Sequence, residues 1–198
     1  MRAALALSLV ALSCASRPPC PAGRVCGGAT WYRPEPAAND RLVVLRALDV
    51  GVPDEPAGMR DAIPLRHGSA FVRFDVAAVP RGARVARALL ALSAHPSWSP
   101  SPDPARLRVR PIADGWTSES VARGAVPATR DAAGVELTLP AGQRASLRVD
   151  VTAAVRAWVE GGASDEGLAL ECDDRGAAFS GAGDLSASRR PRIEVELR

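Results

Sequence analysis

Short hydrophobic runs separated by turn residues occupy the chain from about residue 40 onward. In one of them Val72, Phe74 and Val76 fall on the same face, and the last run alternates in the same way. A period of two is typical of a strand with one buried and one solvated face. Repetition of such runs predicts an all-β sandwich or barrel. The predicted strands are Arg41–Ala47, Ser69–Val76, Arg84–Ala94, Arg106–Ile112, Val135–Leu139, Ala145–Val149, Gly167–Cys172 and Arg192–Leu197.

Two stretches also show helical spacing. In the run 84–94, apolar residues recur at i, i+4 and i+7, so periodicity alone leaves helix and strand open. A short helix is predicted at about residues 151–159, because its apolar residues form one stripe and a Gly-Gly pair at 161–162 supplies a stop. Asp150 or Thr152 can cap its start. The stripe consists of Val151, Val155 and Trp158.

The N-terminus has the features of an export signal. Met1–Ser13 contains one Arg followed by an apolar run of signal length, which is too short to span a bilayer. The run ends in small residues before Cys14 and resembles the lipobox of bacterial lipoproteins, which implies that Cys14 is acylated and anchors the protein in a membrane. A conventional cut near Ala15 or Ser16 is the alternative. Either reading places the protein outside the cytoplasm, anchored at the cell envelope or secreted.

Residues 14–39 are rich in Pro and Gly, a composition that favours a fairly stiff tether over a helix or a ladder. The domain is then expected at 40–198. In an oxidising compartment Cys20 and Cys26 could form a disulfide, which would leave Cys172 as an unpaired core thiol. The cysteines lack the Cys-x-x-Cys or nearby His spacing of a metal site.

Composition bounds the protein further. A chain of 198 residues with 24% charged side chains, 17 Gly and 17 Pro fits one globular domain and not a helical bundle. All 25 basic residues are Arg, against 22 acidic ones, so the formal net charge is only +3. With no basic tail or single-sign block, the sequence does not point to a nucleic-acid partner.

Four segments in order resemble the DNRLRE-domain family. Asp114–Thr117 is similar to that family's central Trp stretch, Val149–Trp158 looks like its "DVTxxVxxW" motif, and Arg190–Val195 resembles its closing "RPxLxVxY". The opening segment, Phe71–Ala88, resembles the family's "LLRFDLSSLPKGAKVTSATL". The resemblance implies a jelly-roll-like antiparallel β-sandwich with one short helix, akin to an alginate-binding type of carbohydrate-binding module. It also implies that the run 84–94 is a strand.

This chain departs from the family pattern in three places. The usual Asn-Tyr-Gly of the N-terminal part is absent, no second Trp follows Trp116, and the end of the chain lacks the closing Tyr. These departures bear on the ligand more than on the fold.

Residue patterns for catalysis are weak. His67 precedes Gly68-Ser69, but no nucleophile elbow surrounds the Ser, and His95 lies before a Pro in a loop where a solvated turn residue is expected. Adjacent loop carboxylates such as Asp173 and Asp174 are usually turn formers and make only a weak Ca²⁺ candidate. The expectation is therefore a protein without a catalytic site, a metal or another cofactor. A glycan-cleaving enzyme, which needs two carboxylates across a groove, is the least favoured reading.

The most suggestive surface feature is the sequence Arg106-Leu107-Arg108-Val109-Arg110. On a strand its three Arg side chains point to one face at intervals of about 7 Å, since the rise is about 3.3 Å per residue. Such a ladder suits the carboxylates or phosphates of a polysaccharide. The alternative is a wet strand face whose Arg residues pair with neighbouring acids.

Trp98 lies in a Ser/Pro-rich loop, where an exposed indole can stack on a sugar ring. Trp116 and Trp158 are better explained as structural residues. The Arg ladder and Trp98 predict a non-enzymatic module that binds polysaccharide. The N-terminal signal predicts that this module is exported. A structural or adhesive module that binds an envelope protein is the alternative function.

Overall fold

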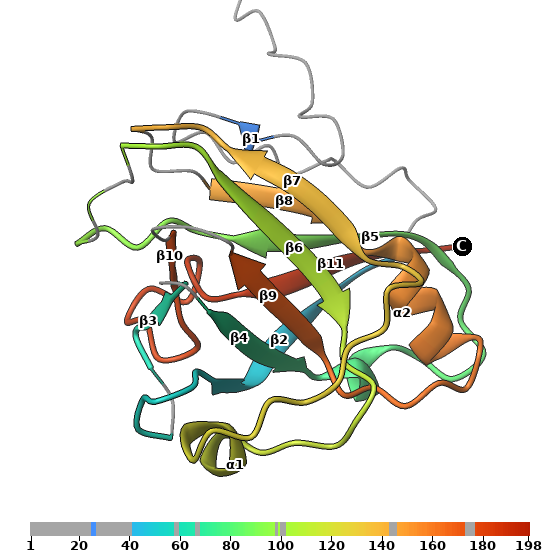
Figure 1. Ribbon diagram of the computed structural model, residues 1–198. Coiled ribbons are helices and arrows are strands. Elements are labelled where there is room, and N and C mark those ends of the chain that lie inside the picture. Colours follow the sequence, from blue (N-terminus) through green and yellow to red (C-terminus); the bar gives the residue numbers. More distant parts are fainter. Residues whose placement is uncertain are drawn as a thin grey trace, which may run out of the picture.

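A computed structural model describes residues 25–26, 41–57, 60–65, 68–97, 99, 102–142, 146–172 and 177–198 (Figure 1). Most of these residues lie in antiparallel strands. The strands are β1 (Val25–Cys26), β2 (Arg41–Gly51), β3 (Ala62–Pro64), β4 (Ser69–Phe74), β5 (Val85–Leu92), β6 (Ala105–Pro111), β7 (Val135–Leu139), β8 (Ser146–Asp150), β9 (Leu168–Cys172), β10 (Ala178–Ser180) and β11 (Arg192–Leu197). The helices are η1 (Val76–Ala78), α1 (Ser118–Ala122) and α2 (Thr152–Val159).

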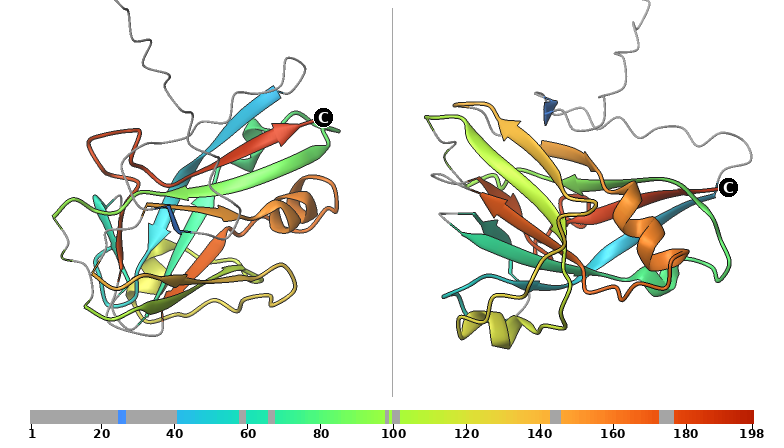
Figure 2. Two further views of the ribbon diagram at one scale, coloured as in Figure 1. Left: turned by 90° about the horizontal axis from the view of Figure 1, so that it is seen from above. Right: turned by 45° about the vertical axis from the view of Figure 1, so that its right-hand side comes forward.

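The strands pair as one long hairpin that has been rolled up. Strand β2 pairs with β11, β4 with β9, β5 with β8, and β6 with β7, from the outside of the hairpin to its tip. Rolling brings β5 beside β11, and β6 beside β9. The result is two four-stranded layers, β8-β5-β11-β2 and β4-β9-β6-β7, which Figure 2 shows facing each other. This is a jelly-roll arrangement, so the predicted fold class is confirmed.

Strand β2 joins the two layers at a corner. Its first half pairs with β11 up to Arg46, and its second half pairs with β4 from Ala47 to Gly51. The register shifts between Ala47 and Asp49, and Leu48 at this bulge is 56% exposed. Bulges bend a strand, which lets one strand pass from one sheet to the other.

The core lies between the layers, as the alternation predicts. Val72 and Phe74 of β4 are buried there, as are Ile193 and Val195 of β11. The run 84–94 forms strand β5, as the resemblance implied. Fully buried positions such as Ala88 and Leu90 explain its near-continuous apolar character, which periodicity could not assign.

Helix α2 closes one end of the core, and its predicted bounds are confirmed. Its N-cap residue is Val151, and the Oδ1 of the preceding Asp150 accepts a hydrogen bond from the Thr152 backbone N–H at 2.9 Å. The Thr152 hydroxyl instead accepts from the Ala88 N–H of β5 at 2.9 Å. The helix ends before Gly162, whose φ of +67° suits glycine. Val151, Val155 and Trp158 are buried, as expected.

A second, smaller core lies outside the layer β4-β9-β6-β7. It is built by Phe71, Ile112, Trp116, Val121 and Ala169. Helix α1 covers it and starts with a capping box, in which Ser120 N–H donates to the Thr117 hydroxyl and Thr117 N–H donates to the Ser120 hydroxyl. Helix α1 was not predicted, because its five residues are too few to show a helical period.

Three short strands were also not predicted. Strands β3 and β10 pair with each other at one end of the sandwich. Strand β1 pairs Val25 and Cys26 with β8, within the segment that composition assigned to a tether without a ladder. That assignment is wrong for these two residues, because two residues of pairing need no extended strand pattern. The rest of residues 14–39 lies outside the described part of the chain.

Candidate functional site

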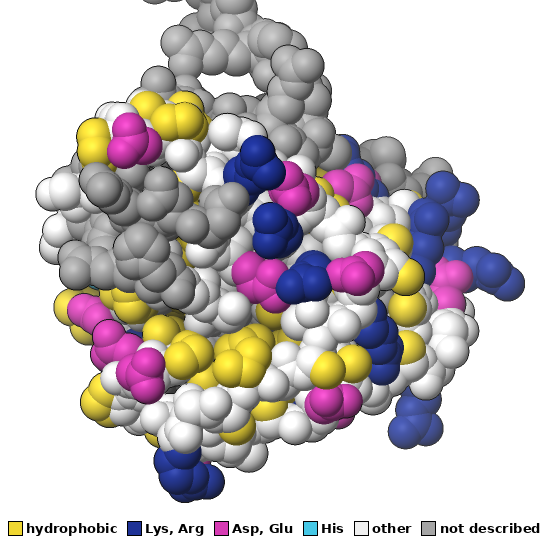
Figure 3. Space-filling model, viewed as in Figure 1, with side chains coloured by type: hydrophobic (Ala, Val, Ile, Leu, Met, Phe, Trp, Pro, Cys, Tyr) yellow, Lys and Arg dark blue, Asp and Glu magenta, His cyan; other side chains and the backbone are white. Residues whose placement is uncertain are grey.

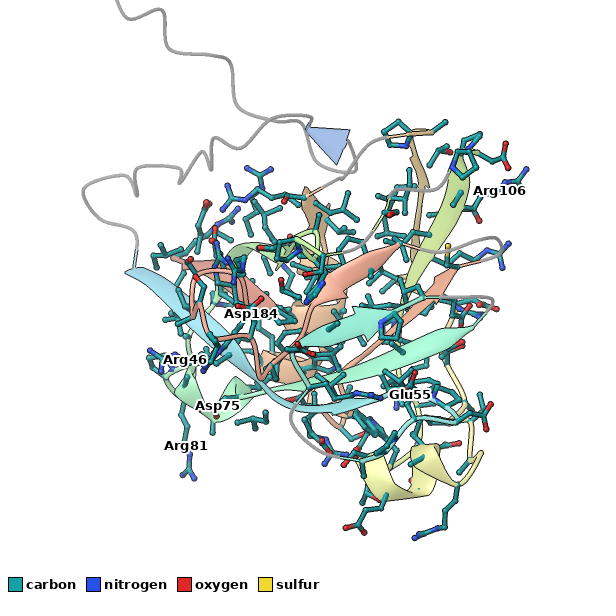
Figure 4. All side chains as sticks on the ribbon, turned by 90° about the vertical axis from the view of Figure 1, so that its left-hand side faces the viewer. Arg46, Glu55, Asp75, Arg81, Arg106 and Asp184 are labelled. Atoms are coloured by element: carbon teal, nitrogen blue, oxygen red, sulfur yellow. The ribbon has the colours of Figure 1, made fainter. Side chains whose placement is uncertain are left out.

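Strand β6 presents the three predicted Arg side chains on its outer face. Ala105, Leu107, Val109 and Pro111 are buried, whereas the intervening Arg residues point outward. Figure 4 shows Arg106 at one end of the strand, directed away from the body of the domain. The predicted geometry of Arg106, Arg108 and Arg110 is therefore present.

Strands β7 and β9 and the loop before β7 supply carboxylates to Arg108 and Arg110. Arg108 Nε donates to Glu136 of β7 at 3.0 Å. Arg110 Nη2 donates to Glu171 Oε1 of β9 at 2.6 Å, and its Nη1 donates to Asp131 Oδ1 at 2.7 Å. The hydrogen bonds to Asp131 and Glu171 raise the pKa of Arg110. The alternative reading of the ladder, Arg paired with acids, thus describes Arg108 and Arg110.

Strand register explains these partners. Glu136 and Glu171 both lie opposite Arg108, on its two sides, and Glu171 reaches diagonally to Arg110. Figure 3 shows basic and acidic side chains interleaved over this side of the molecule. We call the set Arg106, Arg108, Arg110, Asp131, Glu136 and Glu171 the β6 face.

Several predicted site residues lie outside the described residues, so their roles stay predictions. These are Cys14, Cys20, Trp98, Asp173, Asp174 and His67, and Cys26 is described only as backbone. Cys172 is buried in the main core. Within the described ranges, no group of three or more His, Cys, Asp or Glu side chains could hold a metal ion.

His95, which lies within the described residues, is not the solvated turn residue that the sequence predicts. The His95 N–H donates to the Ala178 carbonyl at 3.0 Å, next to the isolated bridge between Ala94 and Phe179 of β10. Its ring Nδ1 is buried and has no hydrogen-bond partner in the described structure. The expectation failed because the Ser/Pro-rich residues after His95 indicated a loop, whereas β10 reaches this position only in the folded protein.

A charged cluster that the sequence analysis missed surrounds Trp116. Arg73 Nη2 donates to the Trp116 carbonyl at 2.6 Å, and the guanidinium lies 5.0 Å from the centre of the indole ring. The Trp116 Nε1–H donates to the Glu166 carbonyl at 2.7 Å. Arg73 also forms an ion pair with Glu166 at 3.3 Å. These contacts fix the 112–117 loop and account for Trp116 as a structural residue, as expected.

Asp165, next to this cluster, has an unusual carboxyl group. Burial raises its pKa to about 6, against smaller opposing effects of the Gly167 N–H and Arg73. Its Oδ1 is buried without a hydrogen-bond partner in the described structure. A carboxyl group in this environment titrates closer to neutral pH than an exposed one.

Two further clusters of charged residues form structural ion pairs. On the outer face of the other layer, Glu194 accepts from Arg148 and forms an ion pair with Arg192 at 3.0 Å. Desolvation lowers the pKa of Arg148. In the β10–β11 loop, the Arg189 guanidinium holds the pKa of Asp184 at about 2. Neither cluster has a local sequence signal, because the Arg148–Glu194 partners are 46 residues apart and loop conformation sets the Asp184–Arg189 pair.

Among the described residues, no helix has the length and apolar character needed to cross a membrane. In the comparisons with known proteins, no protein-family model and no curated protein matches this chain.

Proposed function

We propose that this protein is a non-catalytic, exported binding module whose β6 face contacts a polysaccharide. The observation that carries the proposal is the outward row of Arg106, Arg108 and Arg110 beside carboxylates held in register. A row of planar guanidinium groups on a strand offers repeated hydrogen-bond donors at a regular spacing, which suits a ligand with a repeating unit. The resemblance to the DNRLRE-domain family supports the same kind of function.

Export rests on the signal-like N-terminus. Acylation of Cys14 would hold the module at the cell envelope, with the membrane contacted only through the lipid. Trp98, if exposed beside the ladder, would add a stacking surface for a sugar ring.

A glycan array probed with the mature protein tests the proposal. We expect binding to polysaccharide probes and its loss in the triple variant R106Q/R108Q/R110Q. The matched control is R81Q/R84Q/R198Q, which removes the same charge from three exposed positions away from β6. Unchanged binding by the β6 variant, with normal melting, would reject this face as the site.

The ion pairs of Arg108 and Arg110 favour a second candidate, a structural or adhesive module that binds an envelope protein. A solvated strand face that binds no glycan also carries paired charges of this kind. This candidate predicts no glycan binding and a specific protein partner after crosslinking on whole cells. The glycan array and the crosslinking experiment together therefore distinguish the two functions.

A further inference from the structure

The β6 face carries as many carboxylates as guanidinium groups. Arg106, Arg108 and Arg110 stand beside Asp131, Glu136 and Glu171. From this balance we infer that the polysaccharide bound here is a neutral, hydroxyl-rich one, and not the acidic one that the Arg ladder alone suggests. The inference rests on the proposed function and specifies its ligand.

The carboxylates lie where an acidic ligand would have to bind. Glu136 and Glu171 flank Arg108 on both sides in the strand register. Arg110 already binds two carboxylates, Asp131 and Glu171, through its two terminal nitrogens. At Arg108 and Arg110 a ligand carboxylate must therefore displace a protein carboxylate or approach it closely, and either removes most of the attraction that these guanidinium groups offer.

The same arrangement suits hydroxyl groups. In the described contacts Arg108 donates only through Nε and Glu136 accepts only through Oε2, so two terminal nitrogens of the Arg and one oxygen of the Glu remain available. Their side chains are 43% and 52% exposed. A sugar hydroxyl both donates and accepts, so neighbouring hydroxyls can bind an adjacent donor and acceptor together.

The ion pairs also prepare this face for a neutral ligand. Each pair restrains a long, flexible side chain before binding, which reduces the entropy lost when the ligand is bound. Arg108 is held in this way by Glu136, and Arg110 by Asp131 and Glu171. Binding through fixed neutral pairs should depend little on ionic strength, whereas binding of a polyanion weakens with salt.

The test is affinity electrophoresis of the mature protein through gels that contain a neutral β-glucan, a neutral mannan or polygalacturonate, at low and high NaCl. We expect retardation by a neutral polysaccharide that NaCl does not change. The variant E136Q should weaken this retardation about 10-fold, as loss of about one charged hydrogen bond implies. The matched control is E55Q, which breaks the Arg60–Glu55 pair of 2.6 Å elsewhere and should change nothing.

The outcomes separate the inference from the proposed function. Salt-sensitive retardation by polygalacturonate alone, strengthened by E136Q, would overturn the neutral ligand and leave the polysaccharide function standing. No retardation by any of these gels, together with an empty glycan array, would overturn both. Melting curves of E136Q and E55Q that match the unchanged protein establish that a lost retardation reflects the site and not unfolding.

Discussion

At the scale of single residues, the partners of a side chain matter as much as its placement. Sequence alternation alone puts Arg106, Arg108 and Arg110 on one face, and the structure has them there. Their partners Glu136 and Glu171 come from 28 and 61 residues further along the chain. No local pattern contains that information, because it depends on which strands become neighbours.

Asp165 gives a prediction at this scale. Its pKa is raised from 3.8 to about 6 in the folded protein, so the folded state binds more protons than the unfolded state between these values. The free energy of unfolding therefore falls as pH rises through this window and stays lower above it. Replacement by the neutral isostere, D165N, removes the cost of the buried charge.

We expect D165N to raise the free energy of unfolding at pH 8 by about 1–2 kcal/mol, a value reduced from the full shift because the carboxyl is partly solvated. At pH 4 and below the difference should approach zero, because the native carboxyl is then protonated. Urea denaturation at the two pH values measures it. A difference that does not change with pH would contradict the assigned burial effect.

At the scale of elements, the short hydrophobic runs correspond to the eight strands of the two layers, β2, β4, β5, β6, β7, β8, β9 and β11. The elements that the sequence analysis missed are β1, β3, β10, η1 and α1, each of five residues or fewer. Such short segments form because the surrounding structure supplies their partners. Helix α1, for example, packs Val121 against Trp116 and Phe71 in the outer core.

The entry to β9 shows how close packing limits sequence at this scale. Gly167 has φ of +91°, and a Cβ there would lie 2.1 Å from the Val72 carbonyl oxygen of β4. We expect G167A to lower the free energy of unfolding by about 2–4 kcal/mol, from backbone strain and overpacking together. The control G124A, at φ of +89° with no atom near the added Cβ, should cost only about 1 kcal/mol. Equal losses in denaturant titrations would show that the contact with β4 is unimportant.

At the scale of the whole molecule, the strand order follows from one long hairpin rolled into two layers. Rolling places β6 between β7 and β9, which creates the β6 face from three separate parts of the chain. It also buries the Trp116 side chain between α1 and the sheet. The scaffold therefore determines which charges meet.

The predicted anchor is a property of the whole protein in the cell. We expect full-length protein grown with an alkyne fatty acid to carry the label, and C14S to lose it, because acylation requires the Cys14 thiol. The matched control C172S changes a buried thiol far along the chain and should keep the label, provided that it still folds. An unlabelled chain whose N-terminal peptide begins at Ala15 or Ser16 would instead establish a conventional signal peptide.

The sequence by itself determined where most of the longer strands lie, which side of the alternating strands faces the core, and where α2 begins and ends, whereas side-chain spacing left the run 84–94 open. These properties follow from side-chain spacing along a few consecutive residues, so they can be read locally. Only the tertiary structure decided that Arg108 and Arg110 meet carboxylates, that Asp165 is buried, and that Trp116 lies under a helix. Those properties depend on contacts between residues far apart in the chain, which exist only once the two layers have closed on each other.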